Sequence, residues 1–124
     1  MGSVKITLGG WGEIMTDGIV RDQKEIINYI QDIKAKLMLD KLNNLIIWAR
    51  QDMKNQQCMA ELGLRHNDVA DILLKLSEGN YLETVPDYDR HGEWLWIFNY
   101  QYYEHQIYIK IKLRERVICV SFHE

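Results

Sequence analysis

The chain contains few of the residues that mark metal sites, membrane spans or secreted proteins. Its 124 residues include two cysteines, Cys58 and Cys119, and one proline. The cysteines lie far apart and form no CxxC pair or Cys/His cluster, so we expect buried free thiols and neither a metal nor a cofactor. No stretch approaches the ~20 apolar residues of a membrane span, and no basic-then-apolar signal sequence begins the chain. We therefore expect a cytoplasmic protein without a membrane partner.

The chain also lacks a positive net charge. It carries 15 basic and 18 acidic residues, a formal charge of −3. Proteins that coat nucleic acid are generally strongly basic, so diffuse binding of this kind is not expected. Residues 107–116 are an exception, because they hold four cations against one anion, Glu115. A local basic site on an otherwise acidic domain follows from this pattern.

The composition, 47% hydrophobic and 27% charged, is typical of one globular domain covering residues 1–124. Residues 4–8 predict a short strand. From Asp22 the apolar residues recur at helical spacing, and Asp22 with Glu25 forms a capping-box pattern. Further helices are predicted over residues 42–53, 56–62 and 67–77. The helix at 56–62 is expected to end at Gly63.

After Gly79 the composition changes to aromatic and β-branched residues. Four segments have the character of strands, at residues 81–88, 93–103, 106–113 and 117–122. Helices followed by strands predict an α+β fold with a mostly antiparallel sheet.

The last two segments read as a hairpin whose register can be predicted. Apolar and polar residues alternate over 107–113, so one face must meet the core. Matching the apolar faces of the two strands places Ile111 opposite Val120 and Ile109 opposite Phe122.

The same parity brings a phenol and an imidazole together on the other face. Tyr108 is predicted directly opposite His123, and opposed Cβ atoms lie roughly 4.5–5.5 Å apart. Lys110, Lys112 and Arg114 share that face of the first strand. Such a group is suited to binding an anionic backbone and moving a proton.

Several motifs together resemble one known family. They are "AELGL" at 60–64, "LLKLSEGNY" at 73–81, Tyr88 with His91 and Trp94, and "QIYIKI…VICVSFHE" at the C-terminus. In order and spacing they resemble the MqsR family of toxins from bacterial toxin–antitoxin pairs, from about Leu45 onward. Residues 1–40 then read as an N-terminal extension with one helix, and 41–124 as the toxin core.

The resemblance implies a fold, an activity and partners. Members are α+β proteins of the RelE-like superfamily that cut messenger RNA, and a cognate antitoxin neutralises them. We therefore expect an mRNA interferase (an endoribonuclease), a substrate met free or on the ribosome, and an antitoxin partner.

The family's site residues map unevenly onto this chain. Its active-site tyrosine falls on Tyr108 and its near-terminal lysine on His123. Its first-strand lysine falls on Glu83, and its glutamine falls on Leu95. Because a carboxylate and an imidazole serve as base and acid near neutral pH, we expect Glu83 to be the base and His123 the acid. Tyr108 would then position the phosphate.

Cations near this group are the expected RNA contacts. Lys110, Lys112 and Arg114 follow Tyr108 on the same strand face. Arg90 and His91 are further contributors from a turn between strands.

Two other functions remain open. Residues 58–98 also have the helix, turn, helix and wing layout of a winged-helix DNA-binding protein. Against it, Asp68 and Asp71 lie on the helix that would enter the groove, where phosphate contacts supply most of the affinity. The departures at Glu83 and Leu95 are also compatible with a catalytically silent toxin fold that binds a partner.

Overall fold

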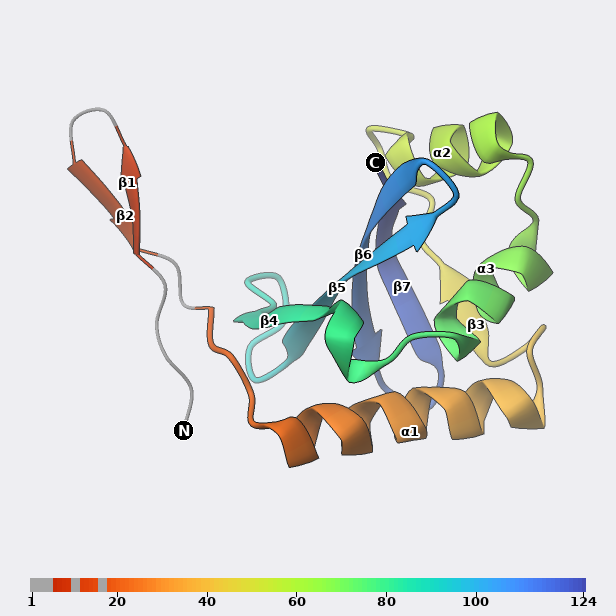
Figure 1. Cartoon of the computed structure of the whole chain (residues 1–124), viewed down its shortest axis with the longest axis horizontal. Coiled ribbons are helices and arrows are strands. Elements are labelled where there is room, and N and C mark those ends of the chain that lie inside the picture. The colour runs from red at the N-terminus through yellow and green to blue at the C-terminus, as the bar shows by residue number, and fades with distance from the viewer. Residues whose placement is uncertain (1–5, 10–11, 16–17) are drawn as a thin grey trace.

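The protein was analysed as a computed structural model, which describes residues 6–9, 12–15 and 18–124 (Figure 1). Strands β1 (Ile6–Gly9) and β2 (Gly12–Met15) form an antiparallel pair. β1 matches the later part of the strand predicted at residues 4–8, whose first two residues lie outside the described ones. No helix in the described part of the chain is long and apolar enough to cross a membrane.

Helix α1 (Gln23–Leu39) begins where the capping pattern predicts. The Asp22 carboxylate accepts from the Glu25 amide at 2.8 Å, and the Glu25 carboxylate accepts from the Asp22 amide at 3.4 Å. These bonds satisfy backbone donors that a helix start leaves free. The apolar stripe of the helix is buried: Ile26, Ile30, Ile33 and Leu37.

The prediction of a helix over residues 42–53 is wrong. The chain leaves α1 through a turn in which the Asp40 carboxylate accepts from the Asn43 amide at 3.0 Å. It then forms a short strand, β3 (Leu45–Ile47), parallel to the C-terminal strand. Three consecutive apolar residues suit a strand buried beside a neighbour, and the helical spacing here was coincidental.

The next helices lie close to their predicted positions. α2 (Lys54–Leu62) ends at Gly63, whose φ of 67° is the left-handed conformation that favours glycine. α3 (His66–Leu74) follows, and a short 3-10 turn, η1 (Glu78–Asn80), leads into the sheet.

The main sheet contains the four predicted strands and β3. They are β4 (Tyr81–Pro86), β5 (Trp94–Tyr102), β6 (His105–Leu113) and β7 (Val117–His123). The order is β3-β7-β6-β5-β4, and every pairing except β3 with β7 is antiparallel. The predicted α+β fold is therefore confirmed.

The register of the terminal hairpin is confirmed at its open end. Tyr108 pairs with His123, and Ile109 pairs with Phe122. The predicted pairing of Ile111 with Val120 is wrong, since Ile111 pairs with Cys119.

The difference is a β-bulge in β7 at Val120. One extra residue in a strand reverses the parity of its side chains beyond that point. As a result Val117 and Cys119 join the main core cluster, whereas Ile118, although buried, is not part of it. Both cysteines are buried free thiols, as predicted, and burial raises the pKa of Cys119 to about 12.

The buried side chain of Asn55 holds this bulge in place. Its Nδ2 donates to the carbonyls of Val120 and Trp48, each at 3.0 Å, and its Oδ1 accepts from the Phe122 amide at 2.8 Å. A bulge leaves ladder groups without partners, and one buried amide satisfies them here. Asn55 thereby fastens the chain after β3 to β7.

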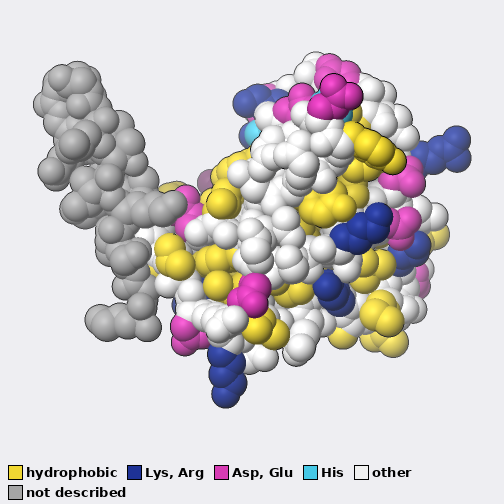
Figure 2. Space-filling view, viewed as in Figure 1, with side chains coloured by type: hydrophobic (Ala, Val, Ile, Leu, Met, Phe, Trp, Pro, Cys, Tyr) yellow, Lys and Arg dark blue, Asp and Glu magenta, His cyan; other side chains and the backbone are white. Residues whose placement is uncertain are grey.

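The helices cover one face of the sheet and leave the other for a site. Apolar residues of α1, α2 and α3 form one core cluster with inward residues of β5, β6 and β7. Tyr29 of α1 stacks on Trp96 with ring centroids 3.8 Å apart. Figure 2 shows one face of the molecule, on which Lys and Arg side chains lie singly among acidic and apolar ones.

Candidate functional site

Tyr108 and His123 lie side by side on the face of the sheet opposite the core, where His123 also borders a hollow lined by residues of α2. Their ring centroids are 5.6 Å apart, with planes 30° from parallel. Both side chains are partly exposed. The predicted juxtaposition therefore exists, and both rings are accessible.

The environment of Tyr108 keeps its hydroxyl protonated. Partial burial raises the pKa of Tyr108, and the negative charge of Glu83 raises it further, although Arg50 acts in the opposite direction. A protonated phenol donates a hydrogen bond, so Tyr108 can bind a phosphate oxygen.

Lys110 is the predicted cation that reaches this surface. Its Nζ lies 5.8 Å from the centre of the Tyr108 ring. Burial and the nearby charge of Arg50 lower the pKa of Lys110. In the described part of the chain, Lys110 makes no ion pair. Its charge is thus available to an anionic ligand.

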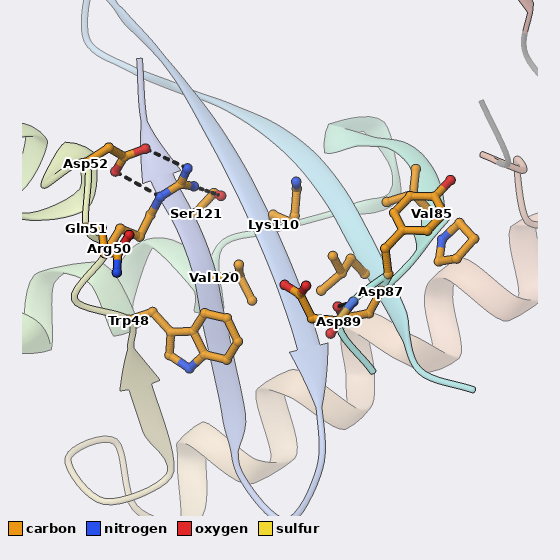
Figure 3. Close-up of a pocket in the computed structure, with 13 residues that line it drawn as sticks. Trp48, Arg50, Gln51, Asp52, Val85, Asp87, Asp89, Lys110, Val120 and Ser121 are labelled. Carbon is orange, nitrogen blue, oxygen red and sulfur yellow. Dashed lines mark hydrogen bonds and ion pairs between the residues drawn. The ribbon is translucent and has the colours of Figure 1, made fainter. Parts of the chain in front are cut away.

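A groove of about 720 Å³ opens beside Lys110 (Figure 3). It is lined by residues 48–52 after β3, by residues 85–89 at the end of β4, and by residues of β5, β6 and β7. Leu95 of β5, where the family resemblance predicts a glutamine, also lines the groove.

Arg50 is a groove residue that the sequence did not indicate. Its Nη1 donates to Ser121 Oγ at 2.6 Å, and its Nε and Nη2 donate to the Asp52 carboxylate at 3.1 and 2.8 Å. It lies in a segment predicted to be helical, and no spacing rule links it to Ser121, 71 residues later.

The structure does not leave Lys112 open to RNA, which corrects its predicted position in an exposed row. Its side chain is only 2% exposed. Nζ donates to Asp87 at 2.6 Å and to Glu93 at 3.2 Å, and it lies 4.9 Å from the Trp48 ring centre. The charge of Lys112 is thus paired with carboxylates of the protein itself.

The remaining predicted RNA contacts, Arg114, Arg90 and His91, do not line the groove. Arg114 donates to Glu93 from Nη2 at 2.9 Å and from Nε at 3.2 Å. Arg90 and His91 are exposed in the connection between β4 and β5, and His91 lines a separate hollow of about 420 Å³. The structure therefore does not gather these three residues with Tyr108.

Glu83 lies on β4, opposite Ile97 of β5. Two strands separate it from His123 on β7, so the two backbones are about 14 Å apart at the usual strand spacing. Tyr108 lies on one of the strands between them. Gly18 passes close to Glu83, since a Cβ on Gly18 would meet Glu83 Oε1 at 2.4 Å.

Comparison with known proteins places these residues in a family context. Residues 34–124 match the model of the family described as "Motility quorum-sensing regulator, toxin of MqsA". A protein of Escherichia coli (strain K12), named mRNA interferase toxin MqsR, is 30% identical over 64 residues. That match covers 52% of this chain and 65% of the relative, just under two thirds of its length.

Proposed function

The chain belongs to the MqsR toxin family, and from this membership we propose that it is an mRNA interferase, the toxin of a toxin–antitoxin pair. The observation that carries the proposal is the pairing of Tyr108 with His123 on the uncovered face of the sheet. The related E. coli protein is named for the same activity.

The proposed reaction is cleavage of RNA by its own 2′-hydroxyl. A base removes the proton from this hydroxyl, whose oxygen attacks the adjacent phosphorus. The bond from phosphorus to the 5′-oxygen then breaks, and an acid protonates that oxygen. The products are a 2′,3′-cyclic phosphate and a 5′-hydroxyl.

Residues of the uncovered face fill these roles. Glu83 is the proposed base, and His123 is the proposed acid. A phosphate lying over Tyr108 would be placed between them, with the phenol donating to one oxygen. Lys110 would stabilise the charge that develops on the phosphorane.

The partners follow from the same proposal. The substrate is messenger RNA, met free or on ribosomes in the cytoplasm, and a cognate antitoxin binds the toxin. Residues 1–40 are proposed as an extension preceding the toxin core at 41–124. Arg114, Arg90 and His91 would contact RNA only beyond the groove.

A catalytically silent toxin fold is the second candidate. It is favoured by the apolar Leu95 in the lining of the groove and by the close approach of Gly18 to Glu83. The winged-helix interpretation loses support, because α3 buries Val69, Ala70, Ile72 and Leu73, and its wing strands belong to a five-stranded sheet.

Replacing His123 by alanine tests the enzyme proposal. We expect His123→Ala to lower RNA cleavage by about 100-fold or more, the usual contribution of a general acid. A long mRNA would be incubated with each protein, with and without ribosomes, and the cut ends mapped.

His105→Ala is the matched control, because strand alternation places His105 on the opposite face from Tyr108. Circular dichroism would verify that both variants fold. An unchanged cleavage rate in His123→Ala would remove the assignment, and no cleavage by the unmodified protein would favour the silent fold.

A further inference from the structure

We propose that Trp48 and Arg50 form a nucleotide-binding subsite for single-stranded RNA, with the indole stacked on a base and the guanidinium bound to the neighbouring phosphate. This inference rests on the proposed ribonuclease function. It concerns the groove beside Tyr108 and Lys110 rather than the reacting groups themselves.

The Arg50 guanidinium is fixed in position and still has donors to spare. Asp52 and Ser121 accept three of its hydrogen bonds. A guanidinium has five N–H donors, so two remain for a phosphate oxygen. The side chain is 29% exposed and lines the groove.

Asp52 largely neutralises the charge of Arg50, and Lys110 provides a further positive charge at the groove. The Arg50–Asp52 pair is nearly neutral, whereas Lys110 has no ion pair in the described part of the chain. Lys110 pairs with Ser121 across the strands, and Arg50 donates to Ser121 Oγ at 2.6 Å, so both cations border the same part of the groove. A phosphate between them would gain from both.

The Trp48 ring is held as a platform. Its backbone amide donates to the Cys119 carbonyl at 3.0 Å, and its carbonyl accepts from Asn55 at 3.0 Å. The Lys112 ammonium lies 4.9 Å from the ring centre. Nevertheless 37% of Trp48 is exposed, and it lines the groove. An indole fixed in this way can stack on any base, because every base has a π-face.

The charges in the groove set the direction of the nucleotide. Arg50 and Lys110 lie at one end, and Trp48 lies toward the end that holds Asp87 and Asp89 (Figure 3). Asp87 is buried and paired with Lys112, so the exposed Asp89 is the carboxylate that would repel a phosphate and accept hydrogen bonds from amino groups on base edges. The phosphate therefore belongs at the Arg50 end and the base at the Trp48 end.

A binding measurement tests this subsite apart from catalysis. A ten-nucleotide single-stranded RNA of mixed sequence would be titrated by fluorescence anisotropy onto proteins carrying His123→Ala, which we expect to slow cleavage about 100-fold or more. Trp48→Leu removes the ring but keeps apolar volume, and we expect it to weaken binding about 5- to 100-fold, the usual effect of losing one stacked base. Trp48→Phe keeps a ring and should bind more tightly than Trp48→Leu.

Arg50→Gln tests the phosphate contact. It should weaken binding and also reduce the slope of log affinity against log salt by about 0.7, the value for one phosphate contact on a single strand. Trp94→Leu is a matched control, because Trp94 is 38% exposed but does not line this groove. Arg65→Gln is the exposed control for Arg50, and both controls should bind as the parent does.

The outcomes separate this inference from the proposed function. If the unmodified protein cuts RNA while Trp48→Leu and Arg50→Gln bind like the parent, the subsite is overturned and the nuclease stands. If it cuts nothing, yet binding depends on Trp48 and Arg50, the subsite stands without the nuclease. If it neither binds nor cuts RNA, both are overturned.

Discussion

Lys110 and Lys112 lie two residues apart on the same face of β6, yet their charges serve different ends. Lys112 is enclosed by Asp87, Glu93 and the Trp48 ring. Lys110 borders the groove, in contact range of Tyr108. One lysine therefore supports the wall of the site, and the other is available to substrate.

The ion pair of Lys112 with Asp87 should make a large contribution to stability. Asp87→Asn leaves a buried ammonium with Glu93 as its remaining carboxylate, and we expect a loss of about 2–4 kcal/mol in unfolding free energy. Breaking a buried pair usually costs 3–5 kcal/mol, and Glu93 offsets part of this. Urea denaturation monitored by circular dichroism would measure the change.

The control is Asp71→Asn, which breaks an exposed pair of similar length. Lys41 and Asp71 are 2.7 Å apart, with side chains 40% and 49% exposed. Exposed pairs contribute less than about 1 kcal/mol. Equal losses in the two variants would show that the buried Lys112–Asp87 pair contributes no more to stability than an exposed pair.

The same pair sets a pH dependence. Burial raises the pKa of Asp87. Hydrogen bonds from Lys112 and the Asp89 amide, together with the charges of Lys112 and Arg114, lower it by more than burial raises it, so the pKa of Asp87 lies below its usual value. A lowered folded-state pKa adds stability above the unfolded value of about 3.9, which is lost as the pH falls through the folded value. Asp87→Asn should therefore lose less stability than the parent on acidification below pH ~4.

At this scale, the sequence predicts contacts within one hairpin better than contacts across the fold. The Tyr108–His123 pairing was predicted by matching the apolar faces of two neighbouring strands. In the structure it also depends on the bulge at Val120, because the register at the turn, Leu113 with Val117, would otherwise place Tyr108 opposite Phe122. The burial of Lys112 depends on Asp87 and Glu93, which reach it from another hairpin. Arg50 and Ser121 meet only because β3 lies beside β7.

At the scale of elements, the bulge in β7 could not be predicted from the order of apolar and polar residues in that strand. Val117–Phe122 has apolar residues at both parities, so no alternation shows where a residue is inserted. The signal lay elsewhere, in Asn55, a polar residue on the inward face of α2. β3 was missed for a related reason, because three residues are too few to show a period.

The segment before α1 forms another element-scale contact, with β4. Ile19 and Thr84 exchange backbone hydrogen bonds, both 2.8 Å long. This pairing carries Gly18 against the Glu83 carboxylate. The edge of β4 and the proposed base are thus both in contact with the segment that precedes α1.

Gly18→Ala tests whether this contact positions the base. The new Cβ would lie 2.4 Å from Glu83 Oε1 and 3.3 Å from Val85 Cγ1, so the flexible carboxylate must turn away. We expect a stability change below about 1 kcal/mol, but a fall in RNA cleavage of about 10-fold or more, because small displacements of catalytic groups are costly. Cleavage assays and urea denaturation would measure both.

Gly79→Ala serves as its control, since the nearest atom to a Cβ there is Ser77 Oγ at 3.8 Å. Its cleavage rate should match that of the parent. Full activity in Gly18→Ala would mean that Glu83 is not held by this contact, or is not the base.

At the scale of the whole molecule, α1 is part of the hydrophobic core. The family match begins at residue 34, inside α1, but the buried stripe of the helix starts at Ile26. Tyr29, which precedes the matched region, stacks on Trp96 of β5. The physical core of this chain therefore extends further toward the N-terminus than the family match.

Two truncations test where the folding unit begins. Removing residues 1–21 deletes the two Ile19–Thr84 hydrogen bonds and the Arg21 guanidinium, which lies 4.9 Å from the Trp94 ring centre. We expect this truncation to lower the unfolding free energy by about 1–3 kcal/mol and to leave a cooperative unfolding transition. Removing residues 1–40 also deletes four buried aliphatic side chains of α1, a loss of about 6–12 kcal/mol at the usual value per side chain. That loss is comparable to the 5–15 kcal/mol that typically holds a domain together, so the shorter protein should be unfolded by circular dichroism. A cooperative urea transition in residues 41–124 alone would instead establish them as a self-sufficient core and reduce α1 to an accessory helix.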